Sequence, residues 1–298
     1  TQRLIDKDTT VEEAVRLNAL MAAAKLDVDL TEPHGPRRAY VAEEGNVLIS
    51  FDADGLHYRI AAELSGDPFI KETFRRYDLE GKPEYKPHVV NTCALFKVGV
   101  EQALGWMEEE APQYTFSKNC IFMLLNGGDT PALVQAAVTD KLDMNIGQID
   151  GLKNNWLVKA HVFRDWREGL VRQAEATGAV TLFDGRRRRY YGLRWKGGKW
   201  QASHEEIKEI YNHPLIGTEV SYVNERLILV LDWIESRPSW RLVLLSHDGF
   251  MLEGPKLEAS LVLETMLPWL IQPFPCGIGK VLNVPWASKQ GTCWALLK

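Results

Sequence analysis

The sequence predicts an α+β fold in which helices and strands are mixed without regular β–α–β alternation. Two observations carry this prediction. Residues 47–51 form a continuous apolar run, typical of a buried strand, which ends at Asp52. Residues 242–246 and 250–252 are apolar runs joined by His247-Asp248-Gly249, and Asp-Gly between apolar runs is a strong hairpin signal. We expect the first strand and this hairpin to share one sheet.

Helix signals occupy most of the remaining chain. Thr10 and Glu13 form a capping box that predicts a helix over residues 10–26. A second helix begins at Leu56 and runs to residue 64, and Thr130-Pro131 opens another with proline at the first helical position. Further helices are expected over residues 92–110, 116–125 and 156–177, from residue 203 and over 219–234, with short strands at 180–183 and 190–200. Residues 73–88 carry many charges and two prolines, which indicate an irregular, solvated connection.

Composition narrows the function classes. The chain has 298 residues, 45% of them hydrophobic, and a formal net charge of −5, which argues against a nucleic-acid coat or membrane-surface protein. No apolar run approaches the roughly 18 residues of a membrane span, and the polar first ten residues predict no secretory leader. The four scattered cysteines favour free thiols in a reducing cytoplasm over disulfides.

Two aspartates lie at the ends of predicted strands. Asp52 closes the first strand and Asp248 lies in the late hairpin, so pairing of these strands would bring the two carboxylates together. Such a pair can hold two divalent cations that align an attacking hydroxyl, a phosphorus atom and a leaving oxygen. Aspartate next to glycine is more often turn chemistry alone, and these residues by themselves leave that alternative open.

Five segments resemble motifs of the family-A DNA polymerases, the DNA polymerase I type, and they occur in the same order as in that family. Residues 52–59 (Asp-Ala-Asp-Gly-Leu-His-Tyr-Arg), with Leu-Ser-Gly-Asp at 64–67, resemble the first acidic motif, and His247-Asp248-Gly249 resembles the second, His-Asp-Glu. Residues 38–45 resemble the lead-in to the first motif. Residues 182–188 resemble Leu-Phe-Gly-Arg-Arg-Arg with one insertion, and residues 212–218 resemble Asn-x-Pro-x-Gln-Gly-Thr. The resemblance extends from about residue 37 to the C-terminus.

The resemblance implies a template-directed DNA polymerase that transfers dNTPs to a primer 3′-OH by a two-metal mechanism. Its fold would be an antiparallel palm sheet that carries both aspartates, with an inserted, mainly helical fingers subdomain. The implied boundaries are residues 1–91 for an N-terminal helix and the first part of the palm, 92–205 for the fingers and 206–298 for the second part of the palm. Asp52 and Asp248 would bind two Mg²⁺ ions, which Mn²⁺ can replace, and would be catalytic together with Lys118.

The family's fingers helix carries Arg, Lys, Phe or Tyr, and Tyr-Gly at intervals of four. The matching residues here are Tyr114, Lys118, Phe122 and Asn126-Gly127. The resemblance makes Lys118 the residue that neutralises the triphosphate and protonates pyrophosphate, and assigns nucleotide binding to Phe122, His57, Asn126 and Tyr114. An ordinary amphipathic helix, with a solvated lysine and a packed phenylalanine, is the alternative.

The resemblance also implies a DNA-binding set. Its members are Arg59, Arg186, Arg187, Arg188, Lys208, Asn212 and His247. The arginine run at 186–189 lies among aromatic residues, a pattern that suits contact with phosphates along a duplex, although a charge run is often only a solvated face.

Five positions depart from the family's pattern. His57 replaces the glutamate that bars ribonucleotides, Gly249 the carboxylate after the second aspartate, Tyr114 the fingers arginine, Asn126 the fingers tyrosine and Ile216 a glutamine that reads the primer. These departures predict either a divergent polymerase or a catalytically impaired DNA-binding or assembly module. A single-subunit RNA polymerase fits less well, since those relatives have a small residue at position 57 and keep the tyrosine at 126.

Only 51 residues precede Asp52, fewer than a thumb needs. We expect the thumb and any exonuclease to belong to a larger protein or to a second polypeptide, as in phage genomes that encode such a polymerase in two parts. The expected partners are primer-template DNA, dNTPs and that second polypeptide, with no membrane. The expected location is the cytoplasm of a bacterial or phage-infected cell.

Overall fold

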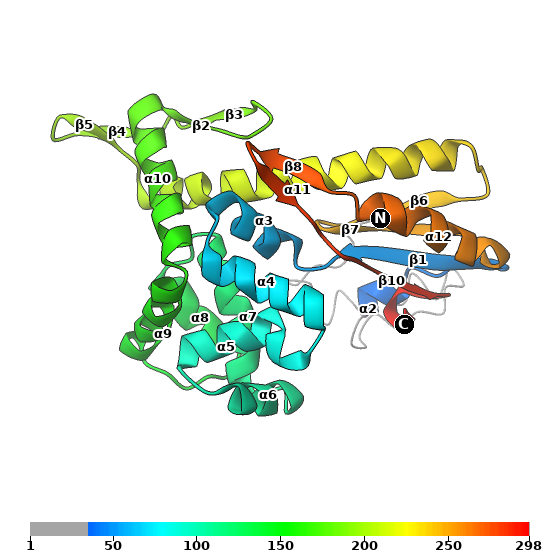
Figure 1. Ribbon diagram of the computed structural model, residues 1–298, viewed down its shortest axis with the longest axis horizontal. Coiled ribbons are helices and arrows are strands. Elements are labelled where there is room, and N and C mark those ends of the chain that lie inside the picture. The colour runs from blue at the N-terminus through cyan, green and yellow to red at the C-terminus, as the bar shows by residue number, and fades with distance from the viewer. Residues whose placement is uncertain (1–34, 298) are drawn as a thin grey trace, which may run out of the picture. The chain divides into compact units, whose positions relative to one another are not determined.

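The structure is a computed structural model that describes residues 35–297 (Figure 1). The described chain forms two compact units. The first unit contains the described residues up to Asp54, Val223–Gln272 and the segment from Val284 onward, and the second contains Gly55–Tyr222 and Pro273–Asn283. The second unit is therefore made of two segments, a long and a short one, that are inserted into the sequence of the first. The helix predicted over residues 10–26 lies outside the described residues.

A four-stranded antiparallel sheet forms the centre of the first unit. Its strands are β1 (Asn46–Ala53), β6 (Arg241–Leu245), β7 (Gly249–Pro255) and β10 (Trp286–Gly291), in the order β10-β1-β7-β6. Pairing of β1 with β7 confirms the prediction that the first strand and the late hairpin share a sheet. The α+β class with a helical insertion is likewise confirmed.

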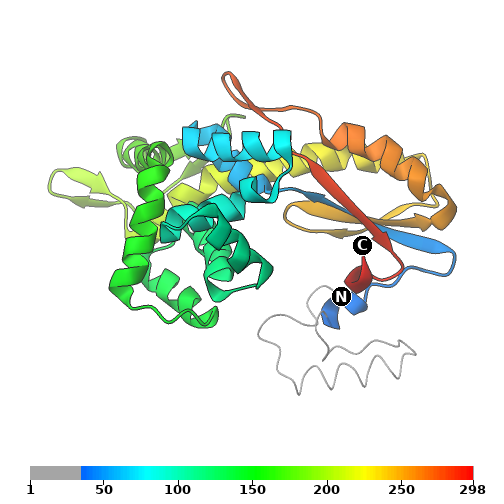
Figure 2. The same cartoon turned by 60° about the horizontal axis from the view of Figure 1, so that its bottom comes forward.

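Aromatic side chains pack closely on this sheet, and two helices lie over it (Figure 2). Phe51 stacks on Phe250 with ring centroids 5.1 Å apart, and a Cβ added at Gly254 would lie 2.3 Å from the Trp240 indole. Figure 2 shows α12 (Ala259–Leu270) beside the C-terminal part of α11 (His204–Glu235) over the sheet. Buried Arg226 of α11 donates to the Leu270 carbonyl at 3.1 Å, so the two helices are also linked by a polar contact.

The two ends of the described chain meet in the first unit. The rings of Tyr40 and Trp294 lie 5.2 Å apart, and the Arg37 guanidinium lies 5.0 Å from the Trp294 ring centroid. Val41 forms a bridge with Cys293. Arg37 belongs to the short helix α2 (Gly35–Arg38) and Trp294 to the helical turn η3 (Trp294–Leu296). A further helical turn of the first unit, η2 (Lys256–Glu258), follows β7.

The second unit is mainly helical. Its elements before α11 are α3 (Leu56–Ser65), α4 (Pro68–Glu80), η1 (Pro83–Tyr85), α5 (Pro87–Phe96), α6 (Val100–Glu108), α7 (Pro112–Leu125), α8 (Thr130–Thr139), α9 (Ile146–Lys159) and α10 (His161–Thr177). Helix α5 lies at the centre. Its buried Asn91 accepts hydrogen bonds from the Tyr58 hydroxyl at 3.0 Å and the Trp156 indole at 2.8 Å, which joins three helices.

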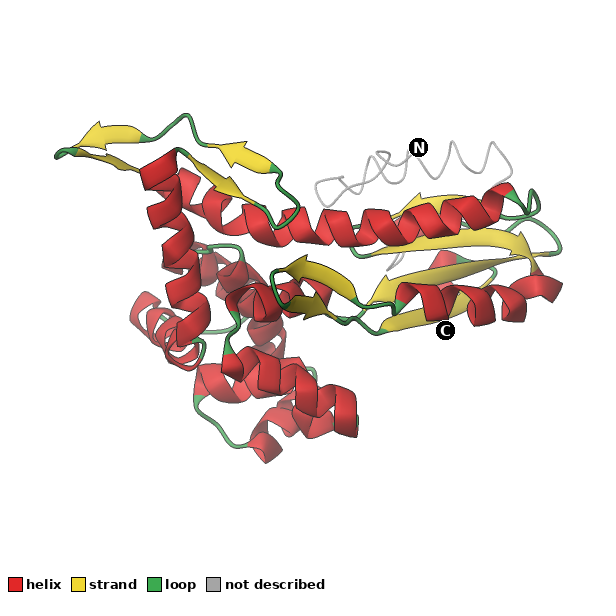
Figure 3. Ribbon diagram, turned by 45° about the horizontal axis from the view of Figure 1, so that its top comes forward, coloured by secondary structure: helices red, strands yellow, loops and turns green. Residues whose placement is uncertain are grey.

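Three two-stranded sheets complete the second unit (Figure 3). They are β2 (Ala179–Thr181) with β3 (Arg187–Arg189), β4 (Arg194–Lys196) with β5 (Lys199–Gln201), and β8 (Phe274–Gly277) with β9 (Lys280–Leu282). Strands β2, β4 and β5 overlap the segments 180–183 and 190–200 in which short strands are predicted, whereas β3 lies between those segments.

Residues 73–88 are not the irregular connection that their composition indicated. They belong to α4, η1 and α5, because the prolines at 68, 83 and 87 occupy first helical positions, where a missing N–H costs nothing. Within α4, Glu72 pairs with Arg75 at 2.6 Å and Arg76 at 2.9 Å, so the charges there support the helix.

Helix boundaries also differ from the predicted ones elsewhere, and α7 begins at Pro112 instead of residue 116. The helix expected over 92–110 is broken at Lys97, whose φ of 55° ends α5. The helix expected over 156–177 is broken at Ala160, since a capping box at Asn145 starts α9 earlier. The two helices expected from 203 and over 219–234 are one, α11, which continues through Pro214 because Ile210 and Tyr222 on either side are fully buried.

The four cysteines are free, as the sequence predicts. Burial raises the pKa of the Cys120 thiol to about 12, which makes that thiol inert. Among residues 35–297, no helix combines the length and the apolar character that a membrane crossing requires.

Candidate active site

Asp52 and Asp248 come together at one end of the four-stranded sheet. In β1, Asp52 is paired with Gly249 of β7 and with Ala287 of β10. The next residue, Ala53, donates its backbone N–H to the Asp248 carbonyl at 2.8 Å. The structure therefore brings together the two predicted aspartates, Asp52 near the end of β1 and Asp248 in the turn that leads into the neighbouring strand β7.

The electrostatics of this strand end favour a cation. Burial raises the pKa of the Asp52 carboxyl to about 6, the negative charges of Asp248 and Asp54 act in the same direction, and Lys289 opposes them. Clustered carboxylates of this kind are relieved by a divalent cation, for which oxygen atoms are the preferred ligands. No group of three or more His, Cys, Asp or Glu side chains in the described chain could hold a metal. Two carboxylates with further oxygens from phosphates and water are nevertheless a usual Mg²⁺ site.

Gly249 follows Asp248, at the position where the resemblance to the family implies a carboxylate. A Cβ added there would lie 2.2 Å from the Phe51 carbonyl oxygen and 3.2 Å from the Cα of Asp52. Real Cβ atoms do not approach a backbone oxygen so closely. The close approach of β1 and β7 therefore excludes a side chain at this position.

Helix α7 presents one exposed face with residues at intervals of four. Tyr114 and Lys118 lie on this face, with the Lys118 ammonium 5.7 Å from the Tyr114 ring centroid, and Phe122 is 59% exposed. Phe122 is therefore not the packed core residue of the alternative interpretation. The opposite face of α7 supplies the core contacts, through Phe116, Ser117, Cys120, Ile121, Leu124 and Leu125.

His57 is held between two polar side chains of the second unit. Its Nδ1 lies 2.7 Å from Oε2 of Glu219 on α11, and its Nε2 lies 3.1 Å from Oδ1 of Asn126. The Asn126 amide donates its own N–H to the Phe122 carbonyl at 2.8 Å, which leaves the oxygen for His57. Both ring nitrogens of His57 thus lie within hydrogen-bond distance of side-chain oxygens, and the two contacts fix the orientation of the ring.

Sequence reasoning found His57 and Asn126 but missed Glu219. Glu219 lies 162 positions from His57 in the sequence. Its helix carries several glutamates, and no sequence pattern distinguishes this one from the others. The two departures at positions 57 and 126 are therefore physically coupled, and a carboxylate is still present next to the position of the family's glutamate. It comes from α11 instead of α3.

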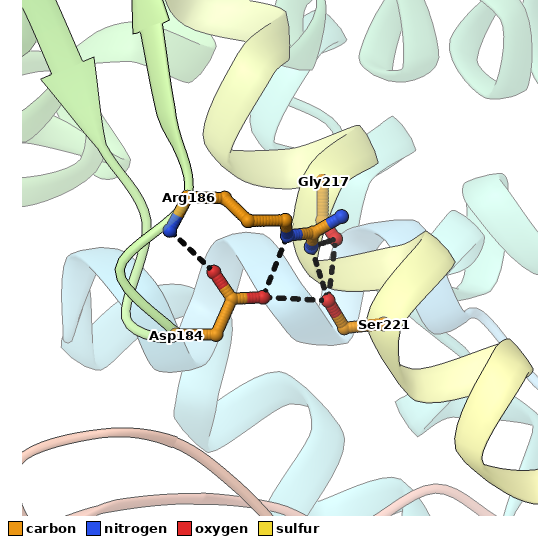
Figure 4. A network of polar contacts seen from close by, with 4 residues as sticks. All are labelled: Asp184, Arg186, Gly217 and Ser221. Atoms are coloured by element: carbon orange, nitrogen blue, oxygen red, sulfur yellow. Dashed lines mark hydrogen bonds and ion pairs between the residues drawn. The ribbon is translucent and has the colours of Figure 1, made fainter.

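Arg186 fastens the β2–β3 loop to α11 (Figure 4). Its Nε donates to Asp184 at 2.8 Å, and its terminal NH2 donates to the Gly217 carbonyl at 2.7 Å and to the Ser221 hydroxyl. The Ser221 hydroxyl donates in turn to Asp184 at 3.0 Å. Arg186 is consequently a structural clamp as well as a candidate for DNA contact.

Arg187 and Arg188, which follow Arg186 in the DNA-binding set, also have partners in the chain. Arg187 donates to the Thr177 carbonyl at 3.2 Å, and Arg188 pairs with Glu209 at 2.5 Å. Both of these contacts are exposed to solvent, where ion pairs and hydrogen bonds exchange readily with other anions.

A pocket lies between this arginine loop and α11. Two buried side-chain atoms near it, Oδ1 of Asn212 and Nε2 of His213, have no hydrogen-bond partner within the described residues. The pKa of His213 lies below its ordinary value because of burial and the nearby Arg188 and Arg186. The pocket is lined by Leu182, Arg186, Arg187, Arg188, Glu209, Asn212, His213, Ile216, Gly217 and Val220.

Arg59, by contrast, is buried. Its guanidinium makes two hydrogen bonds of 2.7 Å to the Asp78 carboxylate and lies 4.3 Å from the Phe74 ring centroid. This bidentate pair joins α3 to α4, so a direct contact between Arg59 and DNA would require it to open.

Lys208 and His247 complete the predicted DNA-binding set. The Lys208 ammonium lies 3.3 Å from Asp129, which also contacts His204 at 2.7 Å. Asp129, rather than Thr130, caps α8. His247 lies exposed in the turn before β7, next to Asp248.

An antiparallel sheet that carries paired aspartates at one end, with a helical insertion between its strands, defines a polymerase fold of the palm-and-fingers kind. Comparison with solved structures agrees. The POL domain of Pol1 from M. smegmatis, in complex with DNA primer-template and dNTP, matches 88% of this chain and 42% of its own with a TM-score of 0.69 and 20% identity. No profile of a known protein family matches the chain.

Curated relatives are DNA polymerases I. The chain is 26% identical over 226 residues to the thermostable enzyme of Thermus thermophilus, covering 76% of this chain and 25% of the relative. It is 22% identical over 263 residues to the enzyme of Aquifex aeolicus, covering 85% of this chain and 41% of the relative. The chain thus spans about a quarter of the length of the first relatives it matches. It is homologous to the family-A DNA polymerases and shares the fold of their polymerase domain.

Proposed function

We propose that this chain is the catalytic part of a template-directed DNA polymerase, which adds dNTPs to a primer 3′-OH. The observation that carries the proposal is the adjacency of Asp52 on β1 and Asp248 in the turn before the paired strand β7, in a chain homologous to DNA polymerase I. The M. smegmatis domain with a similar fold is described in complex with primer-template DNA and dNTP. The same ligands are proposed for this chain.

Asp52 and Asp248 would hold two Mg²⁺ ions, or Mn²⁺ in their place, through carboxylate oxygens. When bound, the ions would activate the primer hydroxyl and balance negative charge on the phosphates as the new O–P bond forms and the bond to pyrophosphate breaks. Exposed Lys118 would give a proton to the departing pyrophosphate. Exposed Phe122 would offer an apolar surface to the incoming sugar and base.

His57 is proposed to select the sugar. Glu219 and Asn126 orient its ring from both sides, so the imidazole has a defined position and cannot rotate freely. A ring held in this way can fill the space beneath the 2′ carbon, which the family closes with glutamate. Ribonucleotide exclusion would thus be retained by a different set of side chains.

Contacts to DNA are proposed for the pocket lined by Arg186–Arg188 and Asn212, and for His247 beside Asp248. The thumb and exonuclease of a polymerase I-like enzyme would come from elsewhere in a longer chain or from a second polypeptide. Co-purification of the chain with a thumb-bearing polypeptide would support the second arrangement.

The test is primer extension by the purified chain with Mg²⁺ or Mn²⁺. We expect Asp52→Asn and Asp248→Asn each to reduce the rate by about a thousandfold or more, because cation stabilisation of the transition state supplies several kcal/mol. Asp232→Asn, a change of an exposed aspartate on α11, is the matched control and should extend at the unsubstituted rate. Full activity in both sheet variants would show that the two aspartates are not the catalytic pair.

One observation favours a second candidate function, a non-catalytic DNA-binding module. Gly249 leaves no room for the carboxylate that the resemblance implies after the second aspartate, so this chain lacks that acidic group. Salt-dependent DNA binding without extension, under every tested metal and with candidate partner chains present, would select this function over the polymerase.

A further inference from the structure

The β4–β5 hairpin is built to extend away from the body of the second unit. Its turn, Lys196-Gly197-Gly198-Lys199, has φ values of 59° and 80° at the two glycines, as a two-residue turn of type I′ requires. In Figures 1 and 3 the hairpin extends beyond the C-terminal end of α10 on the opposite side from β2 and β3.

The base of the hairpin is anchored while its tip is not. Leu193 and Ala202, which flank the two strands, pack on a buried cluster that contains Tyr190 and Ile210. The Ala202 N–H also donates to Glu175 of α10 at 3.1 Å. Every residue of β4 and the first two of β5 are exposed, so the hairpin is held in place without being covered.

The exposed tip carries a pair of tryptophans. Trp195 and Trp200 lie directly opposite each other across the strands, with ring centroids 5.4 Å apart and planes at 75°. They are 62% and 47% exposed, and the nearby Tyr191 is 87% exposed. Three large aromatic rings thus offer apolar surface to solvent within one short segment, an arrangement that marks an interaction site.

The same segment is strongly basic. Residues 186–201 contain seven arginines and lysines and no aspartate or glutamate, in a chain whose net charge is −5. Lys196 and Lys199 are paired directly across the strands, a repulsive arrangement. Within the described part of the chain, no ion pair involves Arg194, Lys196 or Lys199. The hairpin therefore complements a polyanion.

We propose that the β4–β5 hairpin binds single-stranded DNA. Unpaired bases would stack on Trp195 and Trp200, and Arg194, Lys196 and Lys199 would contact the phosphates. Exposed aromatic rings among cations suit a single strand better than a duplex, because the faces of bases are accessible only where they are unpaired. The choice of DNA over other polyanions rests on the proposed function.

Fluorescence anisotropy with labelled oligo-dT and a duplex of equal length tests this assignment. Trp195→Val with Trp200→Val keeps strand-forming residues at both positions but removes the stacking surface. We expect this double variant to bind the single strand at least about tenfold more weakly, with duplex affinity changed less than about twofold. Lys196→Gln with Lys199→Gln, which cannot disturb a core, should make single-strand binding less dependent on salt.

The matched control is Lys141→Gln with Lys159→Gln, two exposed lysines at the ends of α8 and α9, which should leave single-strand affinity unchanged. All measurements are made without dNTPs and repeated in Asp52→Asn, so that binding is separated from catalysis. Unchanged single-strand affinity in both hairpin variants would overturn the proposal. Equal losses for single strand and duplex, or binding to anionic lipid vesicles in preference to oligo-dT, would also overturn it.

Discussion

At the scale of single residues, the candidate site is governed by what surrounds each side chain. Gly249 is a glycine because a strand lies against it, and Arg59 is buried because Asp78 and Phe74 enclose its guanidinium. His57 differs from the family's glutamate, yet Glu219 supplies a carboxylate to the same neighbourhood. A substitution at a functional position is therefore informative only together with its partners.

The His57–Glu219 pair yields a prediction on sugar selection. Glu219→Gln should weaken the orientation of the ring, because a charge-assisted hydrogen bond is worth about 1.5–3 kcal/mol. We expect the preference for dNTPs over rNTPs to fall by about tenfold in Glu219→Gln, and at least as far in His57→Ala. Competition between the two nucleotides in primer extension measures the preference.

Glu225→Gln serves as the control, since Glu225 also lies on α11 but pairs with Arg226. Its sugar preference should equal that of the unsubstituted chain. Selection that is intact in Glu219→Gln and His57→Ala would remove His57 from the proposed sugar-selecting role.

At the scale of elements, the buried carboxylate of Asp67 organises two helices. Its Oδ1 accepts from the Phe69 and Ile70 N–H groups and caps α4, while Oδ2 accepts from the Phe163 N–H near the start of α10. The Leu-Ser-Gly-Asp segment after the first acidic motif thus has a structural role. It joins helices that lie nearly a hundred residues apart in the chain.

Loss of this cap should be costly. We expect Asp67→Ala to lower the free energy of unfolding by about 2–4 kcal/mol, because it removes a cap and leaves a buried N–H of Phe163 without an acceptor. Asn145→Ala, which removes the exposed cap of α9, is the comparison and should cost about 1 kcal/mol. Urea denaturation measures both values. Equal costs would mean that the link from Asp67 to α10 adds no stability.

At the scale of the whole molecule, the chain has a four-stranded sheet in one unit and mainly helices in the other. Its net charge is modest. Three aspartates, Asp52, Asp54 and Asp248, lie near one another at the end of the sheet. Residues 186–201 carry seven arginines and lysines and no acidic residue, so the net charge of −5 does not describe either region.

The acidic end of the sheet should make stability depend on pH. Because the pKa of Asp52 is raised from 3.8 to about 6 on folding, its stabilising contribution is complete below about pH 4 and is lost as the pH rises through about 6. The asparagine side chain of Asp52→Asn cannot ionise at any pH. In the absence of divalent cations, the melting temperature of this variant should therefore exceed that of the unsubstituted chain by more at about pH 7.5 than at about pH 4.5.

Saturating Mg²⁺ should stabilise only the chain with both aspartates, by about 2.7 kcal/mol when its concentration is a hundred times Kd. Thermal unfolding with and without Mg²⁺ measures both effects. Equal stabilisation of Asp52→Asn by Mg²⁺ would place the cation elsewhere.

The sequence by itself determined strand β1, the hairpin at Asp248, the spacing of four along α7 and the family resemblance, because apolar runs, turn chemistry and motif spacing are local properties. It did not determine β10, the fourth strand of the sheet. It did not determine the helices around residues 73–88 or the continuity of α11, since a proline can start a helix or lie within one depending on what buries its neighbours. Only the tertiary structure decided that Glu219 supports His57, that Asp67 caps two helices and that Arg59 is enclosed. Each of these depends on atoms far apart in the chain that packing alone brings within hydrogen-bond distance.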